Sequence, residues 1–252
     1  FSAPFNSYLF EVTHLPFPTE KNILENLKTE LEKGEVACFI FEPLVQGAAG
    51  MKMYSPEILD KMIELCQSYG VMCIADEVMT GFGRTGTFFA FEQYNITPDI
   101  LCIAKALGGG MPIGAFVSSK EIMDCLTNNP MLGHITTFGG HPVNCAAAVA
   151  NIEVIEEENL IEGVKEKGEL MKQLLSHKIV KEIRQIGLML AIDLESDKIT
   201  QQVVEGTMKK GIITFWFLSC PASFRLAPPL TITTKEIELV CKGINEVFDS
   251  VK

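Results

Sequence analysis

The chain of 252 residues is poor in basic residues, in histidine and in tryptophan. It has 21 Lys and Arg against 32 Asp and Glu, four His and one Trp, so its formal net charge is −11. Because no basic patch is present to neutralise phosphates, the composition argues against nucleic acid as a partner. The histidines form no H-E-x-x-H or similar pattern, so no metal site is indicated.

Long apolar runs and paired cysteine motifs are also missing. No run approaches the roughly 18 residues of a membrane-spanning helix, and no secretory signal peptide is visible. Eight cysteines are scattered without a C-x-x-C pair, and most lie inside apolar runs. This favours buried free thiols in a reducing compartment over disulfides or zinc. We therefore expect a cytoplasmic protein.

What the sequence does contain is an alternation of apolar runs and amphipathic segments. Its 47% hydrophobic content suffices for one large domain or two unequal ones. Periodicity and capping residues predict helices over 19–33, 55–70, 118–127, 141–158, 160–176, 199–210 and from 233. Short apolar runs predict strands over 36–41, 71–75, 100–104, 113–117, 180–186, 188–194, 212–217 and 224–226. We read 1–18 as an extended loop.

This alternation predicts an α/β fold with a mainly parallel sheet covered by helices. From about residue 156 the pattern changes, and the strands at 180–186 and 188–194 could pair around Gly187. We therefore predict a large domain over residues 1–155 and a smaller α+β domain over residues 156–252.

Two charged residues end apolar runs. Asp76 follows the run 71–75, and Lys105 follows the run 100–104. Ligands bind in open α/β sheets at the carboxyl edge of the strands, where both residues would lie. A lysine in an apolar setting becomes a nucleophile or a Schiff-base former. On this spacing alone, a lysine-bound cofactor and a structural ion pair are equally good readings.

The segment Gly81–Gly86 fits the dinucleotide-binding pattern G-x-G-x-x-G and follows a strand. Asp99 even lies 99 − 81 = 18 residues further on, near the place of the ribose-binding acid. However, Asp76 and Glu77 stand where a pyrophosphate would approach, five residues separate the strand from Gly81, and no clear helix start follows. A nicotinamide-dependent oxidoreductase is therefore a distant alternative.

The segment 76–86, DEVMTGFGRTG, resembles the signature of the class III aminotransferases, which are fold-type-I enzymes that use pyridoxal phosphate. Further blocks follow in the family's order along essentially the whole chain: 42–47, 98–115, 136–142 and 225–230. Any one block is weak evidence, but the ordered set is specific. The resemblance implies transfer of an amino group from an amino acid or other primary amine to an oxo acid.

The resemblance also implies roles for individual residues. Lys105 would bind the cofactor as a Schiff base and move the proton, and Asp76 would keep the pyridine nitrogen protonated so that the ring stays an electron sink. Val78 would pack on the ring, and Thr137 would reach the cofactor phosphate of a neighbouring subunit, which implies a homodimer. The alternatives without a functional role are that Val78 is an ordinary core residue and that Thr137 is an ordinary loop residue.

On the substrate side, the resemblance makes Arg225 the clamp for a substrate carboxylate, a task suited to a guanidinium. Glu42 and Gln46 would lie at the same strand edge, where Glu42 could be only structural. Arg84 reads as a structural ion-pair partner. A surface salt bridge is the alternative for Arg225.

The chain departs from its ornithine- and acetylornithine-type relatives at two places. Ala48-Ala49 stands where they carry a glutamate that masks the clamp arginine, and Met79 stands where they carry a glutamine. The block 45–51 is closer to diaminopelargonate aminotransferases, and 4-aminobutyrate-type donors also stay open.

The sequence from Phe1 onward resembles the loop that comes just after two features of the family. These are the main phosphate-binding loop and the aromatic residue that stacks on the cofactor ring. We therefore expect the 252 residues alone to bind the cofactor weakly. An aminomutase of the glutamate-1-semialdehyde type, which needs no external oxo acid, is one alternative. A catalytically incomplete subunit that keeps the fold is another.

Overall fold

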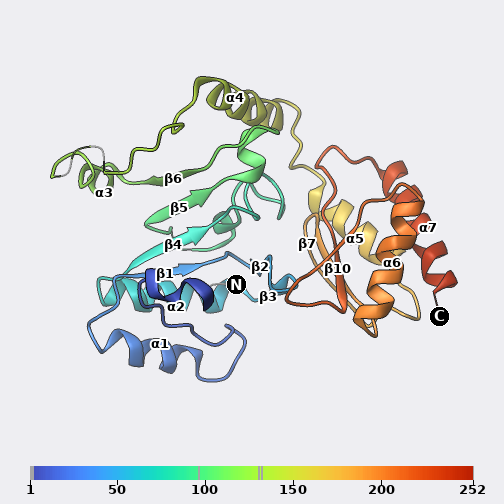
Figure 1. Ribbon diagram of the computed structural model, residues 1–252, viewed down its shortest axis with the longest axis horizontal. Helices are drawn as coiled ribbons and strands as arrows, with labels where there is room; N and C mark the ends of the chain where they lie inside the picture. Colours follow the sequence, from blue (N-terminus) through green and yellow to red (C-terminus); the bar gives the residue numbers. More distant parts are fainter. Residues whose placement is uncertain (1–2, 96, 130, 132, 252) are drawn as a thin grey trace.

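The structure is a computed structural model, and it describes residues 3–95, 97–129, 131 and 133–251. Two four-stranded sheets lie side by side, each with its own helices (Figure 1). Residues before α4 build the first sheet, and residues after it build the second. The predicted boundary after residue 155 falls in the last turn of α4 (Pro142–Glu157) and stays a prediction.

The first sheet has the strand order β1-β4-β5-β6. The strands β1, β4 and β5 are parallel, and β6 runs antiparallel to β5 at the edge, so the prediction of a mainly parallel sheet is confirmed. In this register Phe41 pairs with Ala75, and Asp76 with Cys102. The carboxyl ends of three strands therefore meet at one edge. The bounds are β1 Cys38–Phe41, β4 Met72–Asp76, β5 Ile100–Ile103 and β6 Ala115–Ser118.

Helices α1 (Ile23–Leu31) and α2 (Pro56–Ser68) cover one face of this sheet. Their buried side chains pack with alternate strand residues, because successive residues of a strand point to opposite faces. This core contains Ile23, Leu27, Leu31, Leu59, Met62, Ile63, Cys66, Phe41, Cys73 and Ala75. On the opposite face Ile40, Met72 and Phe116 are 59%, 42% and 43% exposed.

The second sheet is antiparallel throughout and has the order β7-β8-β10-β9. Its bounds are β7 Glu182–Ile186, β8 Met189–Asp193, β9 Phe215–Trp216 and β10 Ser223–Leu226. The helices packed with it are α5 (Val164–Leu174), α6 (Asp197–Lys209) and α7 (Thr234–Ser250). The core between them includes the fully buried residues Leu190, Ile192, Phe224, Ile244 and Phe248.

Several predicted features are confirmed in the second half. β7 and β8 pair antiparallel around Gly187. At the start of α7, the Thr233 hydroxyl accepts a hydrogen bond from the Glu236 amide while the Glu236 carboxylate accepts one from the Thr233 amide. This is the predicted capping box.

Other elements differ from prediction. Residues 3–8 form a 3₁₀ helix, η1 (Ala3–Tyr8), within the expected loop. Helix α5 begins only at Val164, because Gly163 adopts φ +78° and breaks the segment from residue 160. The strand expected over 212–217 is only β9, and α3 (Lys120–Asp124) is short. No α-helix connects β4 to β5 among the described residues of that segment; it contains turns and the 3₁₀ helix η2 (Ala90–Gln93).

The helices in the described ranges include none that is both long and apolar enough to cross a membrane.

Candidate active site

The carboxyl edge of the first sheet brings together three of the predicted site residues. Asp76 ends β4, Glu42 directly follows β1, and Lys105 follows β5 by two residues. The charges of Asp76 and Lys105 both affect the pKa of Glu42. An amine and two carboxylates therefore share the edge where ligands bind in such sheets.

Asp76 is half-buried and held by its own turn. Its Oδ1 accepts a hydrogen bond from the amide of Val78 at 3.0 Å. The amide of the intervening Glu77 donates to the carbonyl of Cys102 at 2.9 Å, which ties the end of β4 to β5. Asp76 therefore has a fixed backbone and a second carboxylate oxygen, Oδ2, for a ligand.

Glu77 points the other way and is fully buried. It accepts hydrogen bonds from the Thr80 hydroxyl at 2.5 Å and the Phe91 amide at 2.8 Å. Burial raises the pKa of this carboxyl, and these hydrogen bonds lower it in part. Glu77 thus anchors the segment 80–91 beneath Asp76, a role that the sequence analysis did not assign.

Lys105 begins the 3₁₀ helix η3 (Lys105–Gly108) with φ +48°, a left-handed conformation that is rare for a residue with a side chain. Such strain is found at functional sites, where the surroundings hold it. The side chain is exposed in this structure rather than enclosed by apolar groups. Its place after β5 agrees with the prediction, and its apolar setting does not.

Helix α4 holds the turn that carries Lys105. Asn151 donates from Nδ2 to the carbonyl of Ala106 at 2.8 Å, and Asn144 donates to the carbonyl of Pro112 at 2.6 Å. Both asparagines were missed by sequence reasoning. The signal in the sequence was two asparagines two turns apart in a helix that is otherwise rich in alanine and valine.

Glu42 precedes the hairpin of β2 (Val45–Gln46) and β3 (Lys52–Met53), and Gln46 lies within it, paired with Lys52. Glu42 Oε2 accepts the amide of Gly47 at 2.8 Å. Burial raises the pKa of Glu42, the Gly47 hydrogen bond lowers it, Asp76 raises it and Lys105 lowers it, with a net increase. Glu42 therefore has both a structural bond and a place beside the lysine.

The glycine-rich segment Gly81–Gly86 is a contact with the second sheet. The Arg84 guanidinium donates to the carbonyls of Pro228 at 2.5 Å and Leu188 at 3.4 Å, and the Arg84 carbonyl accepts the Leu188 amide at 3.0 Å. Arg84 therefore binds backbone carbonyls and not the expected acidic partner. Burial lowers its pKa.

The geometry of this segment does not fit a dinucleotide site. Its glycines face protein atoms, because a Cβ at Gly83 would lie 2.8 Å from Leu230 and one at Gly86 would lie 2.7 Å from Lys165. Asp99 precedes β5 at the opposite edge of the sheet, where it accepts the Cys73 amide at 2.7 Å. No helix N-terminus follows the glycines in the described residues up to Phe89.

Arg225 lies in β10, half-buried, with its guanidinium 5.2 Å from the ring centre of Phe215. Among the ion pairs of the described residues, none involves Arg225. It pairs in register with Ala191, which belongs to an apolar cluster with Val45 and Met51 of the β2–β3 hairpin. Arg225 is thus a stacked guanidinium beside the hairpin that carries Gln46.

Val78 is half-buried after Asp76, as a ring-packing residue would be. Thr137 is exposed in the turn before α4. Its side chain has no hydrogen bond to the strand-edge residues within the described parts of the chain, so this structure does not bring it to Lys105.

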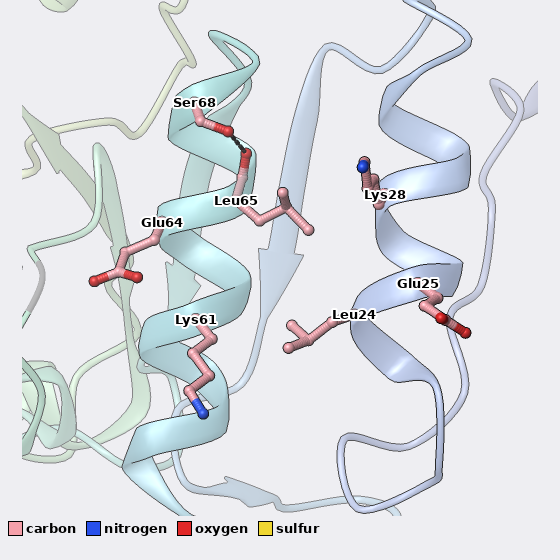
Figure 2. Close-up of a pocket in the computed structure, with 7 residues that line it drawn as sticks. All are labelled: Leu24, Glu25, Lys28, Lys61, Glu64, Leu65 and Ser68. Atoms are coloured by element: carbon pink, nitrogen blue, oxygen red, sulfur yellow. Dashed lines mark hydrogen bonds between the residues drawn. The ribbon is translucent and has the colours of Figure 1, made fainter.

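A shallow groove of about 470 Å³ lies elsewhere, between α1 and α2. Figure 2 shows its lining of Leu24, Glu25 and Lys28 from α1 and Lys61, Glu64, Leu65 and Ser68 from α2. These side chains are of mixed charge and lie on the helices, away from the strand edge, so we assign no chemistry to the groove.

The sequence blocks and the strand-edge residues can be compared with known families. The model of the aminotransferase class-III family matches residues 2–248. The chain belongs to this family. Its members use pyridoxal phosphate (PLP), and the PLP cofactor expected from the sequence is therefore that of the family.

Solved structures agree with this family in fold and sequence. An adenosylmethionine-8-amino-7-oxononanoate aminotransferase from Methanocaldococcus jannaschii is 31% identical, with a TM-score of 0.88 over 100% of this chain and 63% of that chain. An ornithine aminotransferase from Toxoplasma gondii, described with partial occupancy of PLP at its active site, is 30% identical, with a TM-score of 0.87 over 100% and 59%. A Bacillus anthracis aminotransferase is 31% identical, with a TM-score of 0.83 over 91% and 56%.

These matches confirm the predicted α/β, fold-type-I architecture. The chain spans about three-fifths of the length of these relatives.

Proposed function

We propose that this chain carries the lysine, the aspartate and the carboxylate clamp of a class III aminotransferase. The reaction moves an amino group from an amino acid or other primary amine to an oxo acid. One observation supports this most directly: Asp76, Glu42 and Lys105 share the carboxyl edge of one mainly parallel sheet. A structural ion pair alone would not need a lysine with a left-handed backbone at this place.

The residues present fit PLP. The amine of Lys105 and the carboxylate of Asp76 suit an aldehyde and a pyridinium nitrogen, and both residues lie at the carboxyl edge of the first sheet. Lys105, Asp76 and Val78 would hold the group in this chain, and Thr137 would reach the group bound by a second copy of the chain. When bound, PLP supplies an electron sink for the substrate's amine-bearing carbon.

The chain's own side chains supply positioning and proton transfer. Lys105 Nζ is the amine placed to carry a proton, because it is exposed at the edge and held on a turn by Asn151. Arg225 binds a carboxylate of the substrate through its guanidinium, whose stacking on Phe215 restricts its orientation. Gln46 belongs to the hairpin whose Val45 packs with Ala191, the register partner of Arg225, and would contribute to the same end of the site.

The test is the visible absorption spectrum of the purified protein with added PLP. The unmodified chain should show a band of lysine-bound cofactor that amino acids bleach, and Lys105→Ala should lack it. Lys120→Ala is a matched control, since Lys120 pairs with Asp124 on α3 and has no part in the strand edge. A band that persists in Lys105→Ala would contradict the assignment.

The same assay separates the alternatives. Turnover of an amino substrate without added oxo acid would indicate an aminomutase. No band in either protein would mean that cofactor binding needs the phosphate-binding segment that the family carries upstream, or that this chain is a catalytically incomplete subunit.

The amino donor is proposed as a carboxylate-bearing amine of the ornithine, acetylornithine, 4-aminobutyrate or diaminopelargonate type. Two solved relatives are described as ornithine and 8-amino-7-oxononanoate aminotransferases, which supports this range. Ala48 and Ala49 offer no carboxylate that could neutralise Arg225, so the clamp should stay open in both half-reactions. Bleaching rates with each donor would rank them.

We further propose a homodimer in which Thr137 reaches the cofactor of the partner subunit. Thr137 is exposed in the turn before α4, as a residue with a partner across an interface would be. Light scattering should then give twice the chain mass, and Thr137→Ala should weaken PLP binding more than Thr136→Ala. A monomer that binds PLP equally well in both variants would refute this.

A further inference from the structure

Arg184 of β7 links the second sheet to the loop that follows Gln46. Its Nε and Nη2 both donate to the carbonyl of Gly50, at 3.0 and 2.8 Å, across 134 residues of sequence. The side chain is only 15% exposed. A guanidinium that converges two donors on one carbonyl fixes the position of that carbonyl.

Acidic groups hold this guanidinium in turn. Nη2 donates to Oδ1 of Asp193 at 2.7 Å, Nη1 donates to Oδ2 of the same residue, and Nη1 also reaches Glu182 at 3.2 Å. The Ser223 hydroxyl donates to Asp193 as well. Since every nitrogen of Arg184 has a partner, Arg184 is not free to bind a substrate carboxylate, unlike Arg225.

The loop that receives these bonds is short, and its residue Met51 has a backbone conformation that is rare for a residue with a side chain. Gly50 and Met51 both have left-handed backbones, with φ +84° and +51°. The Ser219 hydroxyl donates to the carbonyl of Ala48, and a Cβ at Gly50 would lie 2.9 Å from Cys220. The loop is therefore held against the second half of the chain by hydrogen bonds from the side chains of Arg184 and Ser219.

Apolar contacts also hold the β2–β3 hairpin against the second sheet. Val45 and Met51 are buried with Met189, Ala191 and Phe217 of the second sheet and its loops. The β2–β3 hairpin thus depends on the second sheet for its core, while Glu42 holds the base of the hairpin from the first sheet through the Gly47 amide.

The two arginines occupy one row of the second sheet. Arg184 and Arg225 are both register partners of Ala191, one from β7 and the other from β10. They therefore lie on the same face, one strand apart on either side of Ala191. A bond from Arg184 to the hairpin consequently fixes the hairpin at a set distance from Arg225.

We propose that Arg184 is a positioning residue that determines how Gln46 faces Arg225, and so shapes the end of the site that receives the substrate carboxylate. The effect on substrates rests on the proposed aminotransferase function. The positioning of the hairpin does not, and it can be measured on the chain without cofactor.

The first measurement is amide hydrogen exchange of Arg184→Lys. A lysine has one nitrogen, which cannot serve Gly50 and both oxygens of Asp193 together. We expect the amides paired across the β2–β3 hairpin, and that of Tyr54 next to it, to exchange about tenfold faster, while those of α6 and α7 do not change. Lys210→Met, which removes the ion pair with Glu246 between α6 and α7, is the control and should leave the hairpin unchanged.

Asp193→Asn is the second variant, in case the lysine variant does not fold. It weakens the hold on the Arg184 guanidinium and leaves the donors to Gly50 in place, so it should speed hairpin exchange less than Arg184→Lys, by about threefold. Hairpin exchange unchanged in Arg184→Lys, or raised equally in all elements, overturns the proposal. If Arg184→Lys does not fold, hairpin exchange unchanged in Asp193→Asn overturns it.

The second measurement uses transamination by the unmodified chain and by Arg184→Lys. We expect the KM of an amino acid donor to rise about tenfold with little change in kcat, and the KM of an amine without a carboxylate to stay constant. A loss of folded enzyme would lower kcat for both donors instead, and that result overturns the role in substrate binding. If the unmodified chain shows no transamination, the proposed function fails, and hydrogen exchange alone decides the positioning role.

Discussion

The contact between Gly187 and the Arg84 segment makes a sharp prediction for Gly187→Ala. Gly187 turns the chain between β7 and β8 with φ +51°. A Cβ there would lie 2.4 Å from the carbonyl oxygen of Arg84 and 2.8 Å from the carbonyl carbon of Thr85. Both are backbone atoms, so they cannot move aside as a flexible side chain would.

Two costs add up at this position. A left-handed backbone costs an alanine about 1 to 2 kcal/mol. Forcing a methyl group into a packed contact costs about 1 to 3 kcal/mol more. We therefore expect Gly187→Ala to lower the free energy of unfolding by about 2 to 5 kcal/mol, the sum of these two terms.

Gly211→Ala is the matched control. Gly211 also has a left-handed backbone, with φ +77°, but no atom lies within 4 Å of a Cβ placed there. Only the backbone cost of about 1 to 2 kcal/mol should remain. The difference between the two variants measures the contact itself.

Urea denaturation is the assay, followed by the fluorescence of Trp216, the one tryptophan of the chain, which lies in β9 of the second sheet. Equal losses for Gly187→Ala and Gly211→Ala would mean that the second sheet does not approach the Arg84 segment closely in solution. That outcome would refute our account of the glycine-rich segment as a packing surface.

Three further predictions concern charge and hydrogen bonding. Burial raises the pKa of Asp193, but the hydrogen bonds from Arg184 and Ser223 lower it below the ordinary 3.8. The ionised carboxylate therefore stabilises the fold fully above pH 3.8, and this contribution is lost as pH falls through the folded pKa. Urea titrations should show that the loss of unfolding free energy in Asp193→Asn becomes smaller in acid. The pKa of Glu77 is raised above 4.5, mainly by burial, so its ionisation destabilises the fold as pH rises through the folded pKa. Between acid and neutral pH, Glu77→Gln should therefore lose less unfolding free energy than the unmodified chain. Parallel plots of unfolding free energy against pH for the two proteins would contradict this. Asn151→Ala removes one hydrogen bond to the Lys105 turn, worth about 1 kcal/mol, and should weaken PLP binding about fivefold in a spectral titration, whereas an unchanged affinity would show that the turn holds itself.

The strand-edge residues could be predicted from the sequence because their signal is local. Asp76 and Lys105 each follow a short apolar run, and parallel strands bring their carboxyl ends to one edge. The hairpin at Gly187 and the capping box at Thr233 are equally local, since each depends on residues only a few positions apart.

The links between the two sheets could not be predicted in this way. Arg84 and Arg184 bind backbone carbonyls 144 and 134 residues away, and a carbonyl has no sequence signature. The apolar run 212–217 misled for a related reason: only Phe215 and Trp216 find a strand partner in β10, whereas Ile212 packs on the helical core. Pairing in space, and not the apolar character of the run, decided the strand.

The uncovered face of the first sheet has a practical consequence for work with the isolated chain. Ile40 on β1, Met72 on β4 and Phe116 on β6 present apolar side chains to water on the same face of this sheet, and exposed apolar surface promotes association between molecules. Sedimentation of the 252-residue chain should therefore depend on concentration, with larger species at higher concentration that a mild detergent disperses. Polar substitutions such as Met72→Thr should have the same effect as detergent, and this makes the open face the first place to change when a soluble sample is needed.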